Sequence, residues 1–265
     1  MGILKTWITK NNGIEIIQLL NNRCNCYLLQ KNGTSVLVDT SVHREASTMQ
    51  HRLADLQVDT LACILLTHAH FDHAANAAPL QQQFNCPIYA HSSEAPFLRE
   101  GHSHLPKGTN PLTKVVIGLA GDRVLPMHKF PPCNGTILTE LSDNRPDNPP
   151  NNPPGSPPGR PTGNPPGNPP SELAPLFQQL QLKVLHTPGH TAGSVSYLVD
   201  NQIALVGDAM VNPFHRHIFP PFANNPQQLP ATWQALLNTG CSTFLPAHGT
   251  QIPRALLQRS LTNIR

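Results

Sequence analysis

The sequence predicts an α/β fold, and two observations support this prediction. Short apolar runs of strand length recur along the chain, separated by stretches whose apolar residues repeat at helical spacing. Four of these runs lead into a histidine or an aspartate. Because loops at the carboxyl ends of strands build the functional sites of α/β sheets, this pattern predicts a site at one edge of the fold.

The first half of the chain is predicted to begin with strands. Three runs are rich in β-forming residues: 14–20, 24–29 and 35–38. Lys31-Asn32-Gly33 is a hairpin signal between the last two. Apolar residues at helical spacing predict a helix over residues 45–57, and an apolar run predicts a strand over 61–66. The Ala-, Leu- and Gln-rich stretch 72–84 predicts a helix with Asp72 at or near its start.

The second half repeats this alternation after an interruption. Three more strands are predicted over residues 182–185, 203–206 and 244–245. Two helices follow from apolar stripes, one formed by Leu229, Trp233, Leu236 and Leu237, the other by Leu256, Leu257, Leu261 and Ile264. These stripes carry core residues and no visible chemistry.

Residues 144–170 interrupt the pattern and consist mostly of Pro, Asn and Gly. Proline removes backbone donors, and side chains of this kind cannot form a core, so we expect an extended, disordered insertion. The segment separates two predicted strands, 135–141 and 182–185, which places it at a hairpin tip rather than at a domain boundary. Residues 1–265 are therefore expected to form a single domain.

The segment Thr67-His68-Ala69-His70-Phe71-Asp72-His73 is the densest cluster of chemically active side chains. Imidazole and carboxylate are ligands that divalent metals select. In an extended chain His68 and His70 point to the same side, because side chains two residues apart share a face. The adjacent Asp72 and His73 diverge from that pair. Two pairs with different directions predict two metal ions rather than one.

The pattern His-x-His-x-Asp-His resembles the signature of the metallo-β-lactamase-fold hydrolases. Three later segments resemble further motifs of that family: Thr187–Ser194 with His190, Leu205–Ala209 with Asp208, and Pro246–Gly249 with His248. Their order matches, and the resemblance covers nearly the whole chain. It implies the fold of that family, a four-layer αββα sandwich in which two βα halves pack their sheets face to face with helices outside.

The resemblance also implies a site with two divalent metal ions, zinc first, with iron or manganese as alternatives. One ion would take His68, His70 and His190, the other would take Asp72, His73 and His248, and Asp208 would bridge them. The implied reaction is hydrolysis of an ester-like or amide-like carbonyl by a hydroxide held between the metals. Asp208 and Asp72 would be the catalytic carboxylates, with Asp72 orienting the hydroxide or taking its proton.

An aspartate at the position of Asp39 supports the metal site from behind in this family. Because Asp39 ends a predicted strand, an ordinary turn residue is an equal alternative. Two pairs of further histidines, His102 with His104 and His215 with His217, lie in polar loops and are candidates for lining a substrate pocket rather than for metal ligation.

Within the family, the chain resembles the hydroxyacylglutathione hydrolase and lactonase-like branch in all seven ligands. That branch carries a helical segment after its last histidine, whereas 17 residues (265 minus 248) follow His248 here. We therefore expect a lactone, a thioester or a similar small ester as substrate. Hydroxyacylglutathione hydrolysis and iron-dependent persulfide dioxygenation are the alternatives. β-Lactamase activity fits less well because most classical β-lactamases lack the bridging aspartate, and nuclease activity because no RNA-holding insertion is visible.

Composition bounds the partners. The chain has 18 Lys+Arg against 15 Asp+Glu without a basic cluster, so a nucleic-acid partner is not expected. No apolar run approaches the roughly 18 residues of a membrane span, and the start lacks a secretory signal. The six cysteines show no Cys-x-x-Cys spacing and are expected to be reduced thiols. Together these features predict a cytoplasmic enzyme with a small-molecule substrate. A non-catalytic interaction protein using the Pro-rich segment is the remaining alternative.

Overall fold

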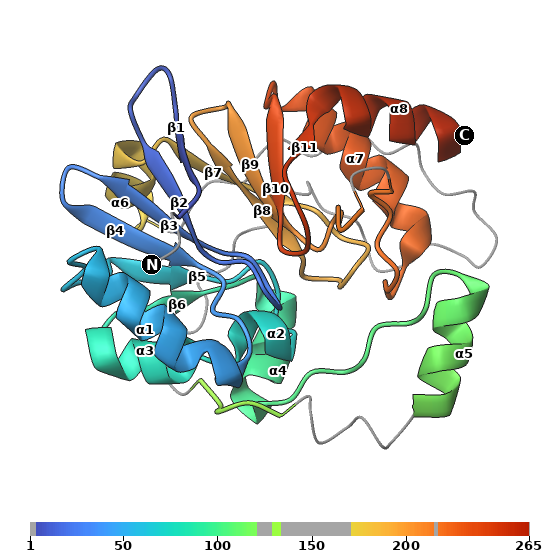
Figure 1. Cartoon of the computed structure of the whole chain (residues 1–265), viewed down its shortest axis with the longest axis horizontal. Helices are drawn as coiled ribbons and strands as arrows, with labels where there is room; N and C mark the ends of the chain where they lie inside the picture. The colour runs from blue at the N-terminus through green and yellow to red at the C-terminus, as the bar shows by residue number, and fades with distance from the viewer. Residues whose placement is uncertain (1–3, 121–128, 134–170, 215–216, 265) are drawn as a thin grey trace.

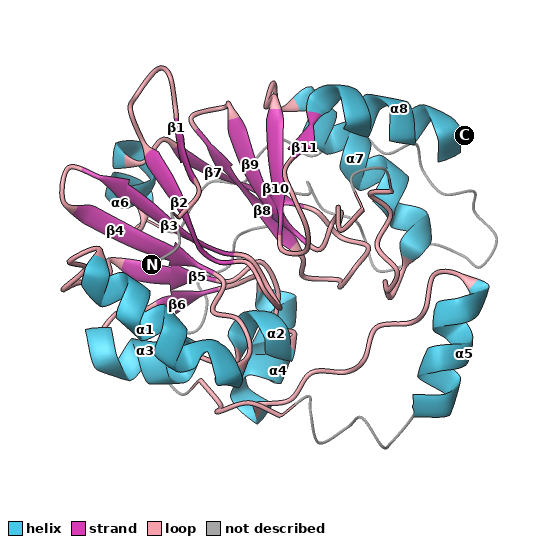
Figure 2. Ribbon diagram, viewed as in Figure 1, coloured by secondary structure: helices cyan, strands magenta, loops and turns pink. Residues whose placement is uncertain are grey.

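The structure is a computed structural model that describes residues 4–120, 129–133, 171–214 and 217–264. Two β-sheets lie between two layers of helices (Figures 1 and 2). Helices α1 and α3 cover the outer side of one sheet, and α7 and α8 cover the outer side of the other (Figure 2). This arrangement confirms the predicted αββα sandwich. The predicted strand 135–141 and the insertion 144–170 lie outside the described residues.

The first sheet has six strands in the order β1-β2-β3-β4-β5-β6. They are β1 (Thr6–Ile8), β2 (Glu15–Leu20), β3 (Cys26–Lys31), β4 (Thr34–Val38), β5 (Cys63–Leu65) and β6 (Ile88–Tyr89). The first four pair antiparallel, and β5 and β6 join parallel to β4. The predicted hairpin between β3 and β4 is present, with Asn32 at φ 49° and Gly33 at φ 76°. Two successive residues with positive φ are what a two-residue hairpin turn requires.

The second sheet has five strands in the order β11-β10-β9-β8-β7. They are β7 (Leu182–His186), β8 (Val195–Val199), β9 (Ile203–Gly207), β10 (Thr243–Pro246) and β11 (Ile252–Pro253). Strand β8 pairs antiparallel with both β7 and β9, whereas β9 and β10 are parallel. The carboxyl ends of β9 and β10 therefore meet at one edge of this sheet.

The helices of the first half are α1 (Ala46–Asp55), α2 (Phe71–Ala74), α3 (Ala77–Phe84), α4 (Ala95–Glu100) and α5 (Pro111–Ala120). Those of the second half are α6 (Ala174–Gln179), α7 (Leu229–Asn238) and α8 (Arg254–Ile264). Three short 3₁₀ helices precede α1, α4 and α7: η1 (His43–Glu45), η2 (Ser92–Glu94) and η5 (Pro226–Gln228).

Alternation of side chains along the strands builds separate cores on the two faces of each sheet. Leu29 and Val36 belong to the core between the sheets, together with Val184 and Tyr197 from the second sheet. Their strand neighbours instead join outer cores: Leu28 and Leu37 with Met49 and Leu53 of α1, and Leu185 and Leu198 with Trp233 and Leu257 of α7 and α8. Both faces of each sheet are buried, which explains the continuous apolar runs in the sequence.

The prediction of a single helix over residues 72–84 is wrong, because this segment forms two helices, α2 and α3. The break occurs at Asn76, whose side-chain amide donates to the carbonyls of Thr40 and Val42 at 2.7 and 2.9 Å. These bonds tie the break to the loop after β4, and helical periodicity alone carries no sign of them. Among the described residues, no helix is long and apolar enough to cross a membrane.

Candidate metal centre and active site

The seven predicted ligands follow strand ends that converge where the two sheets meet. His68 lies three residues after the end of β5, whereas His190 follows β7, Asp208 comes directly after β9 and His248 follows β10. The close approach of β9 to the first half depends on Gly207. Its φ is +51°, and a Cβ there would lie 2.6 Å from the hydroxyl oxygen of Thr67. Glycine tolerates both the positive φ and this contact.

The first group of candidate ligands is His68, His70 and His190, which we call the three-histidine group. His68 Nε2 lies 3.0 Å from His70 Nδ1, which lies 2.9 Å from His190 Nε2. All three side chains are buried. Burial and the neighbouring His190 lower the pKa of His70 to about 3, and burial also lowers the pKa of His68 and of His190. The rings are therefore neutral at pH 7 and offer lone pairs.

The second group is Asp72, His73 and His248, which we call the carboxylate group. His248 Nε2 lies 3.3 Å from Asp72 Oδ2. Burial would lower the pKa of His73, but the carboxylates of Asp39, Asp72 and Asp208 raise it to about 9. Burial would likewise raise the pKa of Asp72, yet His73 and His248 hold it at about 2. This group is thus an ionic cluster without metal.

Asp208 lies between the two groups and directs one oxygen to each. Its Oδ2 lies 3.4 Å from His190 Nε2, and its Oδ1 lies 3.4 Å from His248 Nε2 and 3.7 Å from His73 Nε2. The surrounding histidines hold the pKa of Asp208 well below its ordinary value despite burial, so it is a carboxylate. Its Oδ1 and His73 Nε2 are buried atoms without a hydrogen-bond partner.

Asp39 supports His73 from the side opposite Asp208. Its Oδ2 lies 2.9 Å from His73 Nδ1, which leaves Nε2 of the same ring facing the ligands. The backbone N–H and the hydroxyl of Thr67 both donate to Asp39 at 2.8 Å. Of the two roles considered for Asp39, the structure supports contact with a ligand, although its φ of +59° also makes it a turn residue. A carboxylate behind a ligating histidine fixes the ring and raises its basicity.

Glu94 is the residue near the site that sequence reasoning missed. It is buried, and its carboxylate accepts hydrogen bonds from Ala69 N at 2.9 Å, Thr191 Oγ1 at 2.7 Å and Gly193 N at 3.0 Å. It thereby joins the loop of His68 and His70 to the loop of His190. An isolated glutamate in η2 carries no motif, so only the contact between distant loops identifies it.

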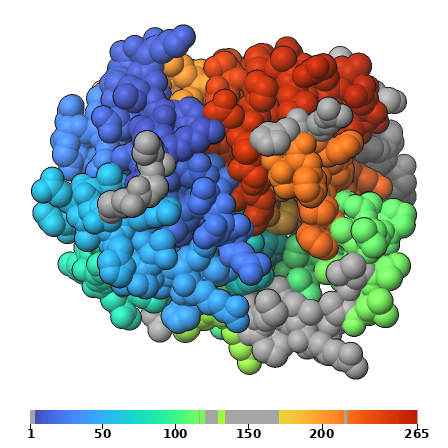
Figure 3. All heavy atoms as spheres, in the orientation of Figure 1, coloured from blue at the N-terminus to red at the C-terminus, as the bar shows by residue number. Residues whose placement is uncertain are grey.

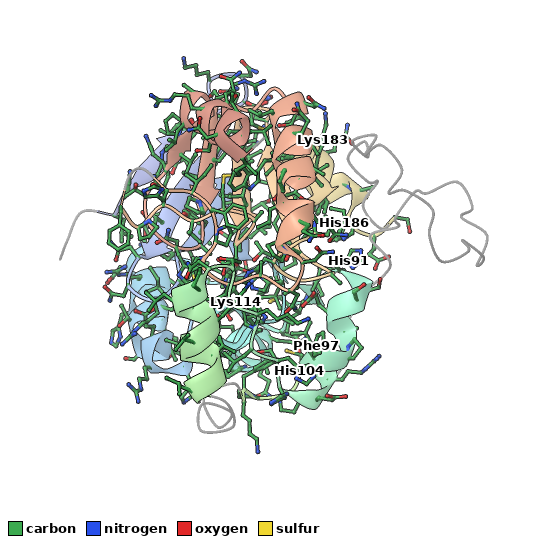
Figure 4. The ribbon with its side chains drawn as sticks, turned by 90° about the vertical axis from the view of Figure 1, so that its right-hand side faces the viewer. His91, Phe97, His104, Lys114, Lys183 and His186 are labelled. Carbon is green, nitrogen blue, oxygen red and sulfur yellow. The ribbon has the colours of Figure 1, made fainter. Side chains whose placement is uncertain are left out.

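A stacked pair of rings, His91 and His186, joins the same two halves (Figure 4), and His91 lies directly before η2, which carries Glu94. Their centroids lie 4.6 Å apart with an interplanar angle of 7°. His186 Nε2 lies 2.8 Å from the carbonyl oxygen of Ala192, within the loop that carries His190. The sequence offers no spacing signal for this pair either.

A cavity of about 410 Å³ opens above the ligands, in the size range of small-molecule sites. Its floor is formed by His70, Asp72, His190, Asp208 and His248. Its other lining residues, which we call the apolar walls, are Phe71, Leu105, Pro106, Ile117, Val211, Pro213, Pro220, Pro221 and Phe222. Figure 3 shows the surface hollowed between α5 and the second half of the chain.

The histidines considered as pocket residues do not belong to the described lining. His102 and His104 lie next to each other, with ring centroids 5.4 Å apart, and His104 also contacts Phe97 (Figure 4). His217 is exposed, and His215 lies outside the described residues.

A family model described as the Metallo-beta-lactamase superfamily matches residues 21–248, which contain all seven predicted ligands. The chain belongs to this superfamily. One curated relative is the probable polyketide biosynthesis zinc-dependent hydrolase BaeB of Bacillus velezensis, 38% identical over 80 residues, which cover 30% of this chain and 34% of BaeB. The chain spans about a third of the length of several curated relatives that it matches, from 32% to 34%.

Two solved structures share this fold. The superfamily protein ST1585 of Sulfolobus tokodaii has a TM-score of 0.59 at 16% identity, covering 96% of this chain and 87% of its own. TTHA1623, solved in a di-iron-bound form, has a TM-score of 0.52 at 21% identity, and the match covers 97% of this chain and 98% of TTHA1623.

Proteins of this superfamily bind divalent metals, commonly zinc or iron, and the donor set of the present chain fits such ions. Ligand atoms within each of the two groups lie within 4.8 Å of one another. The unpartnered His73 Nε2 and Asp208 Oδ1 are buried atoms that a cation would satisfy. Buried polar atoms are costly without partners, so a cation accounts for both.

Proposed function

We propose that this chain is a metal-dependent hydrolase that holds two divalent ions, zinc first, and cleaves a lactone, a thioester or a similar small ester. The single observation that carries the proposal is the placement of Asp208, with one carboxylate oxygen toward each ligand group. A carboxylate in this position suits two ions better than one, because each oxygen has its own set of histidine neighbours.

The residues that would hold the ions follow from these distances. The three-histidine group offers three neutral nitrogens, which favour zinc or iron over magnesium or calcium. The carboxylate group offers one oxygen and two nitrogens, and Asp208 completes both sets. When bound, two such metal ions activate water and neutralise the negative charge that develops on a carbonyl oxygen.

Asp72 is the chain's own group best placed to act on the attacking water. It lines the cavity floor, and 21% of its side chain is exposed. Because its pKa is about 2, Asp72 is ionised at neutral pH and accepts hydrogen bonds readily, but it is a weak base. We therefore assign it chiefly the orientation of water, with proton transfer as the lesser role.

Two further observations support hydrolysis of a carbonyl compound. The relative BaeB is named a probable zinc-dependent hydrolase. The cavity is open to solvent at the surface yet buries the three-histidine group, so a substrate carbonyl reaches the floor while the ligands stay shielded. The proposed partners remain a small-molecule substrate, without nucleic acid or membrane, in a cytoplasmic protein.

The deciding experiment combines metal analysis with a substrate panel. Protein purified without added metal is analysed by mass spectrometry for zinc, iron and manganese, and is then assayed with lactones, alkyl thioesters, aryl esters and β-lactams. We expect two ions per chain and hydrolysis of a lactone or an ester. A single iron per chain, with oxygen consumption in the presence of a persulfide, would replace this proposal with a dioxygenase.

A further inference from the structure

The apolar walls of the cavity contain no charged and no hydrogen-bonding side chain among the described residues. The polar lining residues are the five floor residues that belong to the metal site. A charged group placed against these walls would lose its hydration without gaining a partner, which is strongly unfavourable. An alkyl group placed there would gain free energy in proportion to its buried area.

Helix α5 supplies one wall, and its position is fixed by hydrogen bonds at its start. Asn110 and Thr113 bond reciprocally, with Thr113 N donating to Asn110 Oδ1 at 2.9 Å and Asn110 N donating to Thr113 Oγ1 at 3.2 Å. Just before them, Thr109 donates to the carbonyls of Pro221 and Pro220 at 3.0 and 2.8 Å. The start of α5 is thus attached to a segment that forms another part of the apolar walls.

These bonds determine which face of α5 meets the cavity. Thr113 is buried, and Ile117, four residues later on the same face, lines the cavity. Leu112, Val115 and Leu119 lie on another face and are 73%, 57% and 77% exposed. Ile117 therefore contacts whatever occupies the cavity, whereas Leu119 on the same helix provides a matched position outside it.

We propose that the cavity selects substrates whose acyl part is an uncharged alkyl chain, and that Ile117 is a specificity-determining residue. This inference rests on the proposed hydrolase function and narrows its substrate class. The carbonyl would lie at the floor, and the chain would lie along the apolar walls. Acyl groups that carry a carboxylate, an ammonium or a phosphate near the carbonyl are disfavoured.

The test uses the metal-loaded full chain and a series of esters with one leaving group and acyl chains of two to ten carbons, plus the eight-carbon chain ending in a carboxylate. We expect kcat/KM to rise by about fourfold per methylene until the cavity is filled, the value that corresponds to burial of one CH₂. The terminal carboxylate should cancel most of that gain.

Two variants test the role of Ile117. Ile117→Lys should lower kcat/KM for the octanoyl ester by about a hundredfold more than for the acetyl ester, since a charge enters the alkyl site. Leu119→Lys should change neither. Equal losses for both esters in Ile117→Lys would overturn the assignment of Ile117.

A binding measurement separates this inference from the proposed function. Pentan-2-one and nonan-2-one carry a carbonyl that cannot be hydrolysed, and their affinity is measured by calorimetry. Tighter binding of the longer ketone supports an alkyl site even if no ester is cleaved, an outcome that would contradict the hydrolase alone. Cleavage of the acetyl ester with no dependence on chain length in either assay would overturn the alkyl inference alone.

A second inference rests independently on Glu94. A buried carboxylate is tolerated only where donors satisfy it, and Glu94 has three, all from the loops that carry His68, His70 and His190. Gly193 is required beside it, because a Cβ there would lie 2.5 Å from Glu94 Oε1. We infer that Glu94 is a positioning residue that holds the three-histidine group together across the two halves.

Glu94→Gln tests this role, because glutamine keeps the size but presents an N–H to at least one donor. The measurement is a two-step cobalt titration of metal-free protein, with the absorption spectrum of each bound ion and a competing chelator for affinity. We expect the ion of the three-histidine group to bind at least tenfold more weakly, and the ion of the carboxylate group to bind normally. The matched control is Glu100→Gln, which alters an exposed glutamate of the next helix.

The selectivity between the two ions distinguishes positioning from general stability. Equal weakening of both ions together with a lower melting temperature would assign Glu94 to the fold alone. Unchanged affinity for both ions would remove it from the site. Either result overturns the inference.

Discussion

The three-histidine group and the carboxylate group differ in charge and exposure although they share Asp208. The former is neutral and buried, and its pKa values lie below the ordinary value of histidine. The latter is ionic and more open, with 29% of the His248 side chain and 21% of the Asp72 side chain exposed. Without metal, one half of the site is held by burial and the other by ion pairs. Metal binding should therefore release protons from only one half.

The largest effect is expected for Asp208, the residue common to both groups. Asp208→Ala should lower the affinity for both metal ions by about a hundredfold or more and abolish hydrolysis. Removal of a residue that only supports a ligand from behind already lowers metal affinity or activity by about tenfold to a hundredfold. Metal content after dialysis and turnover with the best ester measure this. Retention of two ions with normal turnover would show that Asp208 does not bridge the groups.

A smaller and one-sided effect is expected for Asp39, which among the candidate ligands contacts only His73. Asp39→Asn should lower the affinity of the carboxylate group for its metal ion by about tenfold to a hundredfold and leave the affinity of the three-histidine group unchanged. The pKa of His73 should also fall, because Asp39 is the foremost carboxylate that raises it. Cobalt titration measures the affinities, and histidine NMR of metal-free protein measures the pKa. Weaker binding of both metal ions would contradict the claim that Asp39 acts on the carboxylate group alone.

In metal-free protein, the two groups should change the free energy of unfolding in different pH ranges. The raised pKa of His73, about 9, stabilises the fold fully below the unfolded value of 6.5, and this contribution is lost as pH rises through 9. The lowered pKa of His70, about 3, destabilises the fold as pH falls below 6.5, because the unfolded chain binds the proton more readily. Stability should therefore be greatest between these limits, near neutral pH.

Urea unfolding from pH 4 to pH 10 measures this profile. The same shifts predict that the carboxylate group releases a proton when it binds an ion near pH 7, whereas the three-histidine group does not. Calorimetry in buffers of different ionisation enthalpy counts the protons. Equal release from both groups would show that their charge states do not differ.

The smallest effect is expected for Cys24, whose sulfur lies 3.8 Å from His73 Nδ1. The burial of this thiol raises its pKa well above the ordinary value, so it is neutral and only a weak partner. Cys24→Ala should lower the free energy of unfolding by about 1 kcal/mol, as for other small buried groups, without changing either metal affinity by more than about threefold. A larger loss of metal would make Cys24 a ligand.

The positions of the candidate ligands at strand ends could be predicted because they depend on local features. An apolar run of strand length followed by Gly, Pro and a polar residue marks a strand end in the sequence itself, as at Val206-Gly207-Asp208 and Leu245–His248. The hairpin at Asn32 and Gly33 is equally local, since positive φ is a property of those residues. The resemblance to the family supplied the assignment of ligands to ions.

The tertiary structure alone decided the contacts between segments far apart in sequence. Asn76 divides a helix because its amide finds carbonyls more than 30 residues earlier, and Glu94 joins loops 25 and about 100 residues away. The apolar walls combine Ile117 of α5 with Val211, Pro213 and Pro220–Phe222, which no periodicity connects. Hydrophobic periodicity and turn-forming residues act over a few positions in the sequence. A hydrogen bond between distant loops, or a cavity wall, requires two segments to meet, and only the packing of the two sheets brings them together.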